Sequence, residues 1–177
     1  MIKLFHIIFL LLIVTCNDNY NNTYENIKKL RINKDHTNAI IELKKLLDTN
    51  LKENQKDESY FTIAEIYLND IKDFNKSIEY FSMVSENSDF YPKSIFMIGY
   101  VYSNNLNEFT KAAKYYNTFK NNFNKHELYS SVLYELELLD KNKSIIDSLN
   151  NIAYKRKKIN EKKWKYRWKN NWTFNGF

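Results

Sequence analysis

Two stretches of this chain resemble each other at an offset of 35 residues, and this repeat constrains the fold more than any other feature. The first pair reads YFTIAEIY over 60–67 and IFMIGYVY over 95–102. The stretches that follow match in the same way, with FNKSIEYFSMV over 74–84 and FTKAAKYYNTF over 109–119. A repeat of this length indicates paired helices, and such pairs bury their apolar faces only by stacking on their neighbours.

The composition favours an entirely helical fold. Only two glycines and one proline occur in 177 residues, and apolar residues rarely alternate with a period of two, so strands are hard to place. Removal of a leader would leave about 160 residues, which is enough for one continuous core. We therefore expect an all-α chain with one folded domain over residues 24–153.

Small side chains recur where two helices of a pair must approach each other closely. Ala64 and Gly99 stand in the first helix of each unit, and Ser77 and Ala112 stand in the second. This pattern resembles the tetratricopeptide repeat (TPR). The resemblance implies a short TPR-like solenoid of helical hairpins, with two clear units between two degenerate half-units.

The pattern departs from that family in three ways. Each unit has one residue more between its tyrosine (Tyr67 or Tyr102) and its second small position. The terminal proline is missing, and the first position is Tyr or Ile instead of Trp. Pro92, the only proline, falls where it can begin the next helix in its first turn.

The segments on either side of the two units keep part of the pattern. Upstream, Ala39, Leu43 and Leu46 repeat the spacing of a second helix, but Ala39 lies 38 residues before Ser77, its counterpart in the first clear unit. This larger offset predicts a longer loop between them. Downstream, helical spacing is kept by Tyr129, Val132, Leu133, Leu136 and Leu139.

The amino-terminal segment reads as an export signal. Lys3 precedes an apolar stretch of about eleven residues, Leu4–Val14, which is shorter than the roughly 20 needed to span a bilayer. We expect a signal peptide over 1–15. Its end resembles a bacterial lipobox, which implies a lipidated Cys16 followed by a polar tether over 16–23. The alternative is an ordinary signal peptide that ends by chance at the only cysteine in the chain.

The carboxyl-terminal segment 154–177 is basic and rich in tryptophan. It holds nine basic residues and one acidic residue, a net charge of +8 against +6 for the whole chain. The three tryptophans are spaced four apart, which places them along one stripe of a helix. This favours binding to an anionic membrane surface, and a cell-wall polymer or an acidic partner would suit the tail equally. The candidate residues are Lys157, Lys158, Lys162, Lys163, Trp164, Arg167, Trp168 and Trp172.

Two alternatives exist for that tail. The tryptophan stripe would cover the last helix of the stack if the tail is a structural cap. Aromatic and basic side chains together also bind single-stranded nucleic acid, but an export signal disfavours that partner.

The tetratricopeptide resemblance also implies a binding groove along the inner side of the stack. Aromatic and amide groups at the matching positions suit an extended peptide or a partner helix. In the alternative interpretation, Phe61 and Phe96 pack under the neighbouring helix instead. The candidate groove residues are Phe61, Glu65, Leu68, Asn69, Phe96, Tyr100 and Asn104.

Catalytic, metal and cofactor sites are not expected. His36 and His126 stand alone, without a cysteine or a serine arrangement nearby. The carboxylates form no recognisable acid/base motif, and the chain has no glycine-rich phosphate loop. These observations predict a binding protein and not an enzyme.

The combination of a lipidated cysteine with a helical stack is similar to the outer-membrane assembly lipoproteins of the BamD type. This resemblance implies an adaptor or scaffold anchored in the bacterial cell envelope, facing the periplasm, with an envelope protein or peptide as partner. It implies a role in outer-membrane protein assembly or envelope maintenance. The alternatives are the membrane- or wall-binding tail and a secreted binding module without a lipid.

Overall fold

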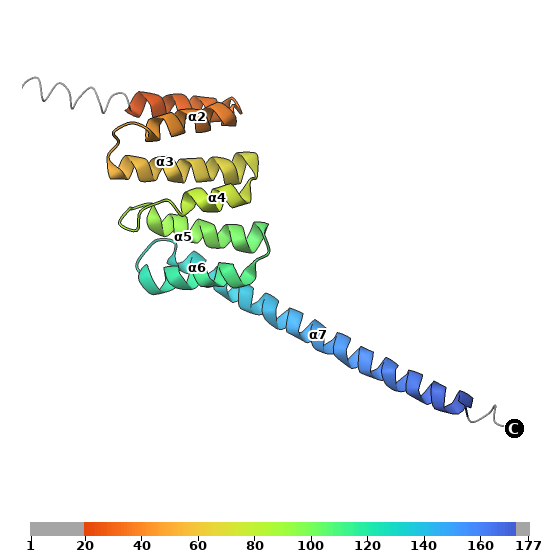
Figure 1. Cartoon of the computed structure of the whole chain (residues 1–177). Coiled ribbons are helices and arrows are strands. Elements are labelled where there is room, and N and C mark those ends of the chain that lie inside the picture. The colour runs from red at the N-terminus through yellow and green to blue at the C-terminus, as the bar shows by residue number, and fades with distance from the viewer. Residues whose placement is uncertain (1–19, 173–177) are drawn as a thin grey trace, which may run out of the picture. The chain divides into compact units, whose positions relative to one another are not determined.

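The computed structural model describes residues 20–172, and side chains up to residue 163. All regular structure in this part is helical, which confirms the all-α prediction (Figure 1). The expected signal peptide and Cys16 lie outside the described residues. The elements are a first helix over 20–32, α2 (His36–Leu47), α3 (Glu53–Glu65), the π-helical turn η1 (Ile66–Ile71), α4 (Phe74–Phe81), α5 (Tyr91–Tyr100), the π-helical turn η2 (Val101–Asn105), α6 (Phe109–Asn122) and α7 (Tyr129–Trp172).

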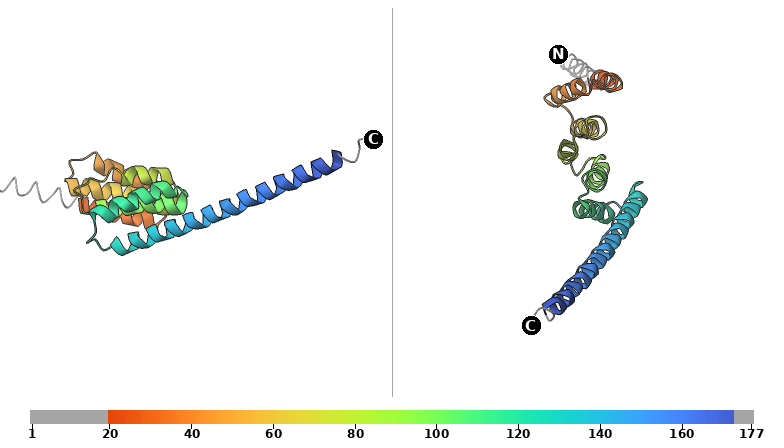
Figure 2. Two further views of the ribbon diagram at one scale, coloured as in Figure 1. Left: turned by 90° about the horizontal axis from the view of Figure 1, so that it is seen from below. Right: turned by 90° about the vertical axis from the view of Figure 1, so that its right-hand side faces the viewer.

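The helices up to Val132 form one compact unit with two layers. The first helix, α3 and α5 lie in one layer, and α2, α4 and α6 lie in the other (Figure 2). From α2 to α6, each helix contacts the next along the chain, so the polypeptide alternates between the layers. The core between the layers is apolar and includes Ile27, Leu43, Ile63, Ile66, Ala64, Phe81, Ile98 and Val101.

The three hairpins turn in the same way. Lys34, Lys72 and Asn107 have positive φ angles of 61°, 66° and 56°, and each lies two residues before the second helix of its pair. Lys72 and Asn107 are 35 residues apart, as the sequence repeat requires. The repeat is therefore present in the backbone conformation of the turns as well as in the side-chain pattern.

The two π-helical turns explain the extra residue in each unit. η1 and η2 begin 35 residues apart, each one residue before the tyrosine of its hairpin (Tyr67 or Tyr102), and both end before the second small position. A π turn closes its hydrogen bond over one residue more than an α turn does. The residue in excess of the tetratricopeptide pattern is therefore accommodated within the helix.

Aromatic contacts repeat between the two hairpins. In each, two tyrosine rings stack and a lysine ammonium lies over one of them, an arrangement that adds cation–π attraction to the buried apolar area. The ring centroids are 5.6 Å apart in the first hairpin and 5.7 Å apart in the second, and the lysines lie 5.2 Å and 5.1 Å from the ring centroids. The residues are Tyr67, Tyr80 and Lys76 in the first, and Tyr102, Tyr115 and Lys111 in the second.

The small positions are buried, as the sequence predicted. Ala64, Ser77 and Ala112 have no exposed surface, and Gly99 is also buried. A Cβ atom added to Gly99 would lie 2.6 Å from Cε1 of Tyr116, closer than real Cβ contacts allow. This close approach of α5 to α6 is the physical reason for a glycine at this position.

The prediction of a longer loop upstream of the repeat is wrong. The connection between α2 and α3 covers only residues 48–52, whereas α4 and α5 are joined by residues 82–90. The three additional residues belong to α3, which has 13 residues against 10 in α5. The backbone N–H of Lys52 donates to Oε1 of Gln55 at 3.0 Å, which caps this longer helix. Pro92 lies in the first turn of α5, as predicted.

The segment boundaries also differ from those expected. The first helix is already formed at residue 20, so residues 20–23 are helical instead of part of a tether. The reason is that Tyr20 is buried and its hydroxyl donates to Oε2 of Glu58 at 2.7 Å. At the other end, α7 continues unbroken across residue 154, so residues 154–172 share one helix with the residues before them.

Candidate functional site

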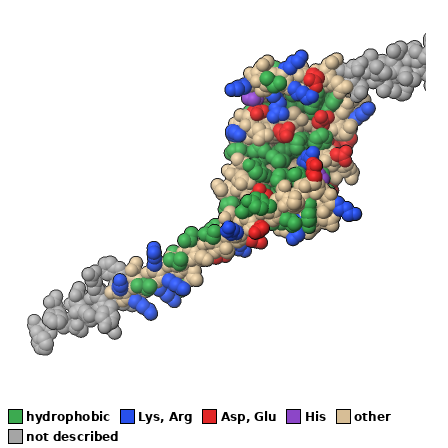
Figure 3. Space-filling view, turned by 180° about the vertical axis from the view of Figure 1, so that it is seen from behind, with side chains coloured by type: hydrophobic (Ala, Val, Ile, Leu, Met, Phe, Trp, Pro, Cys, Tyr) green, Lys and Arg blue, Asp and Glu red, His purple; other side chains and the backbone are tan. Residues whose placement is uncertain are grey.

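The layer formed by the first helix, α3 and α5 presents the predicted binding face. Viewed from this side, apolar side chains gather across the middle of the compact unit, with charged side chains above and below them (Figure 3). The predicted groove residues belong to α3, α5 and the π-helical turns that follow them.

The seven predicted groove residues differ in their accessibility. Leu68 is buried in the core cluster that contains Ala64 and Phe81, so it is not available to a ligand. Ser103, which is 35 residues further along and also in a π-helical turn, is buried too. Asn69, Tyr100 and Asn104 are exposed, and Phe61, Glu65 and Phe96 are half-buried.

Each of the two phenylalanines is held on one side by other rings. The Phe61 ring centroid lies 5.2 Å from that of Phe81 and 5.3 Å from that of Phe90. The Phe96 centroid lies 5.9 Å from that of Tyr116. Both aromatic residues therefore pack against neighbours and still keep part of their surface free. Side chains fixed in this way lose little conformational entropy when a ligand binds them.

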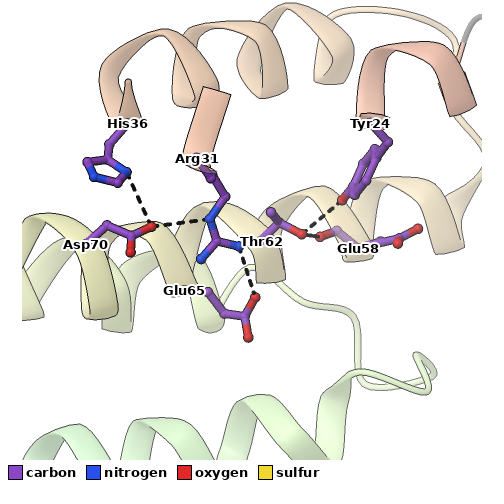
Figure 4. A network of polar contacts seen from close by, with 7 residues as sticks. All are labelled: Tyr24, Arg31, His36, Glu58, Thr62, Glu65 and Asp70. Carbon is purple, nitrogen blue, oxygen red and sulfur yellow. Dashed lines mark hydrogen bonds and ion pairs between the residues drawn. The ribbon is translucent and has the colours of Figure 1, made fainter. Parts of the chain in front are cut away.

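An ion-pair network lies at one end of the face (Figure 4). Arg31 Nε is 3.2 Å from Asp70 Oδ2, and Arg31 Nη1 is 3.8 Å from Glu65 Oε2. His36 Nδ1 also approaches Asp70 Oδ2, at 3.5 Å. The guanidinium of Arg31 thus joins the first helix to both α3 and the turn η1.

Among the predicted groove residues, Glu65 has a carboxyl group whose pKa is raised. Burial raises the pKa of the Glu65 carboxyl group, and nearby Asp70 raises it further, whereas Arg31 and Lys93 lower it. A partly desolvated carboxylate is a strong hydrogen-bond acceptor. The face therefore combines aromatic surface with an acceptor suited to an N–H group or a basic side chain.

Two tyrosine hydroxyl groups fix the first helix on α3. Besides the bond from Tyr20 to Glu58, Tyr24 and Thr62 share a hydrogen bond of 3.0 Å between their hydroxyl oxygens (Figure 4). Burial raises the pKa of Tyr24 to about 12, so this phenol stays protonated at neutral pH. The position of Arg31 relative to Glu65 therefore depends on several contacts along the helix.

Sequence reasoning identified Glu65 but missed its partners. Arg31 and Asp70 are 39 residues apart, in different helices, and no local pattern connects them. His36 was expected to stand alone, and the structure instead places it beside Asp70.

The predicted tail residues lie on α7. Lys157, Lys158, Lys162 and Lys163 are exposed there. Trp164, Arg167, Trp168 and Trp172 belong to the last turns of α7, but their side chains are outside the described part.

The described part of the chain holds neither a metal-ligand cluster nor a membrane-spanning helix. No three His, Cys, Asp or Glu side chains come together there in an arrangement for a metal ion. No helix between residues 20 and 172 is both long enough and apolar enough to cross a membrane. Models of protein families and curated protein sequences were also compared with the chain, and none of them matches it.

Proposed function

We propose that this protein is an adaptor of the bacterial cell envelope, built as a tetratricopeptide-like stack that binds a segment of a partner protein. The observation that carries the proposal is the repetition of two hairpins at 35 residues, in their helix ends, turns and tyrosine stacks. Stacked repeats of this kind form extended surfaces, and such surfaces are used for binding.

The partner segment is a peptide or amphipathic helix with apolar anchors. Phe61, Phe96 and Tyr100 offer aromatic surface to such anchors, and Glu65 offers an acceptor to a donor group near them. Aromatic side chains in partly enclosed positions supply most of the energy of many interfaces. Asn69 and Asn104 are exposed beside them and suit the backbone of a bound peptide.

The place of action follows from the amino-terminal sequence. The expected signal peptide and the lipobox-like end at Cys16 support export and attachment to a membrane. An anchored stack of this kind serves outer-membrane protein assembly or envelope maintenance by holding a partner near the membrane.

A comparison of two variants tests the binding face. Tyr100 on α5 and Phe109 on α6 are both 37% exposed, but they belong to different layers. Partners are cross-linked and purified from native membranes with each variant. Tyr100→Ala should weaken capture of the partner by about 30-fold or more, whereas Phe109→Ala should leave it unchanged. A folded Tyr100→Ala protein that captures the same partners as the unaltered protein would contradict the proposed face.

A further inference from the structure

The helix α7 exposes a regular apolar stripe. From residue 140 to residue 163 every residue is exposed. Among these exposed residues, Ile145, Ile152 and Ile159 follow one another at intervals of seven, and the half-buried Leu138 precedes them at the same interval. That spacing keeps them on one side of the helix with only a slow drift, as in the seam of a left-handed coiled coil. Exposed apolar surface of this kind marks an interaction site.

The remaining seam positions complete a heptad register. With the four apolar residues at d, the a positions are Asn142, Leu149, Arg156 and Lys163. The first half of the seam is therefore mainly apolar, and the second half places two cations among the isoleucines. The g positions beside this seam are Lys141, Ser148, Lys155 and Lys162, so no acidic residue lies on that flank.

These charges disfavour a second copy of this chain as the partner. In a parallel pair, Arg156 would face Arg156 and Lys163 would face Lys163 at the centre of the interface. An antiparallel pair would instead bring the lysines of the two g columns together. Like charges at such close positions destabilise helix pairs, most of all where the neighbouring apolar residues exclude water.

A membrane surface is also disfavoured as the occupant. Four consecutive basic residues, 155–158, point in directions about 100° apart and so surround the helix. A helix that lies in the headgroup layer has its cations on one side and its apolar residues on the other. Immersing the Ile152 and Ile159 side of α7 would carry part of this basic ring into the apolar layer.

We infer that the Leu138–Ile159 stripe of α7 is a docking surface for an acidic amphipathic helix of another protein, bound as a two-stranded coiled coil. Charge complementarity identifies the partner, since residues 138–163 hold eight basic and three acidic side chains. Acidic residues on the partner helix would pair with Arg156, Lys163 and the lysine flank, while its own apolar seam covers the isoleucines. The inference is independent of the binding face proposed on α3 and α5.

The test uses the complete chain and two labelled synthetic peptides. Both have leucine at a and d; one has glutamate and the other has lysine at e and g. Fluorescence anisotropy should show binding of the glutamate peptide alone, and added salt should weaken it. Ile152→Asn should weaken binding by about tenfold or more. Tyr154→Asn is the matched control, because Tyr154 is as accessible as Ile152, with 58% of its surface exposed against 49%. It should have no effect, because Tyr154 lies on nearly the opposite side of α7.

A charge reversal on α7 provides a further test, and four results would contradict the inference. Arg156→Glu should weaken binding of the glutamate peptide, and circular dichroism should show unchanged helix content in every variant. Equal binding of both peptides, or equal effects of Ile152→Asn and Tyr154→Asn, would overturn the inference. So would a homodimer in analytical ultracentrifugation that Ile152→Asn dissociates. Sedimentation with anionic vesicles that Arg156→Glu reduces, without any binding of the glutamate peptide, would assign the stripe to a membrane instead.

Discussion

Replacement of Gly99 by alanine tests the close packing of α5 on α6. An added Cβ would lie 2.6 Å from Cε1, 2.8 Å from Cδ1 and 3.2 Å from Cζ of Tyr116. All three are ring carbons of a fully buried side chain, and the ring also contacts Phe96. The ring therefore cannot swing into solvent to relieve the contact, and α5 or the ring must shift within the core.

Two opposing effects determine the size of the change. Alanine is favoured over glycine inside a helix by about 1 kcal/mol. Forcing an additional methyl group into a packed core costs about 1–3 kcal/mol. Because the contact is well below van der Waals distance, we expect the cost to dominate. The free energy of unfolding should fall by roughly 1 kcal/mol, with a decrease of about 4 °C in the melting temperature.

Urea unfolding followed by far-ultraviolet circular dichroism measures this loss. Tryptophan fluorescence is unsuitable, because all three tryptophans lie beyond residue 163. Tyr116→Phe keeps every ring carbon involved, so Gly99→Ala should cost the same in that background. Tyr116→Leu removes the ring, and Gly99→Ala should then be neutral or stabilising. A Gly99→Ala protein that is more stable than the unaltered one, or an equal cost in both backgrounds, would refute the reasoning.

Three further predictions follow from the contacts and the sequence. Asp57→Ala should lower the free energy of unfolding by about 1–3 kcal/mol in the same urea assay. The reason is that Oδ1 of the buried Asp57 accepts a hydrogen bond from the backbone N–H of Ser85 at 2.8 Å. Asp57→Asn keeps an acceptor, so its free energy of unfolding should fall by less. Burial raises the pKa of Glu65, so the folded protein binds that proton more tightly than the unfolded chain and loses stability as pH rises through the pKa. Glu65→Gln has no carboxyl group to titrate at this position, so the free energy of unfolding of the variant minus that of the unaltered protein should increase between about pH 4 and pH 7. A difference that does not change with pH would contradict this. Cys16→Ser should move the protein from the membrane fraction to the soluble fraction, and unchanged partitioning would argue against acylation.

The hairpins could be predicted from the sequence because their signals are local and repeated. The small residues Ala64 and Gly99 identified where helices meet, and Pro92 identified a helix start. Both features appear in the structure at the expected positions. Their repetition at 35 residues made each signal stronger than a single occurrence would be.

Other features depend on effects that a side-chain pattern does not reveal. The start of α3 is polar over 53–58, so no apolar periodicity marks the helix, and the cap from Gln55 sets its beginning. Leu68 was assigned to the groove from the tetratricopeptide resemblance. It lies in the π-helical turn η1, where the additional residue changes the direction of side chains.

The partners of Glu65 were also beyond local sequence reasoning. The contact of Arg31 with Glu65 forms only when the first helix packs on α3, so it is a property of the tertiary structure. The heptad spacing on α7, in contrast, is visible in the sequence, but its exposure becomes evident only from the structure.

Site-specific photo-cross-linking in native membranes tests the central claim most directly. A photoreactive phenylalanine analogue is placed at residue 100, on the proposed binding face, or at residue 109, an equally exposed position in the other layer. The account predicts a defined protein adduct from position 100 and none from position 109. The same adducts from both positions, or adducts from position 109 alone, would contradict a binding face on α3 and α5.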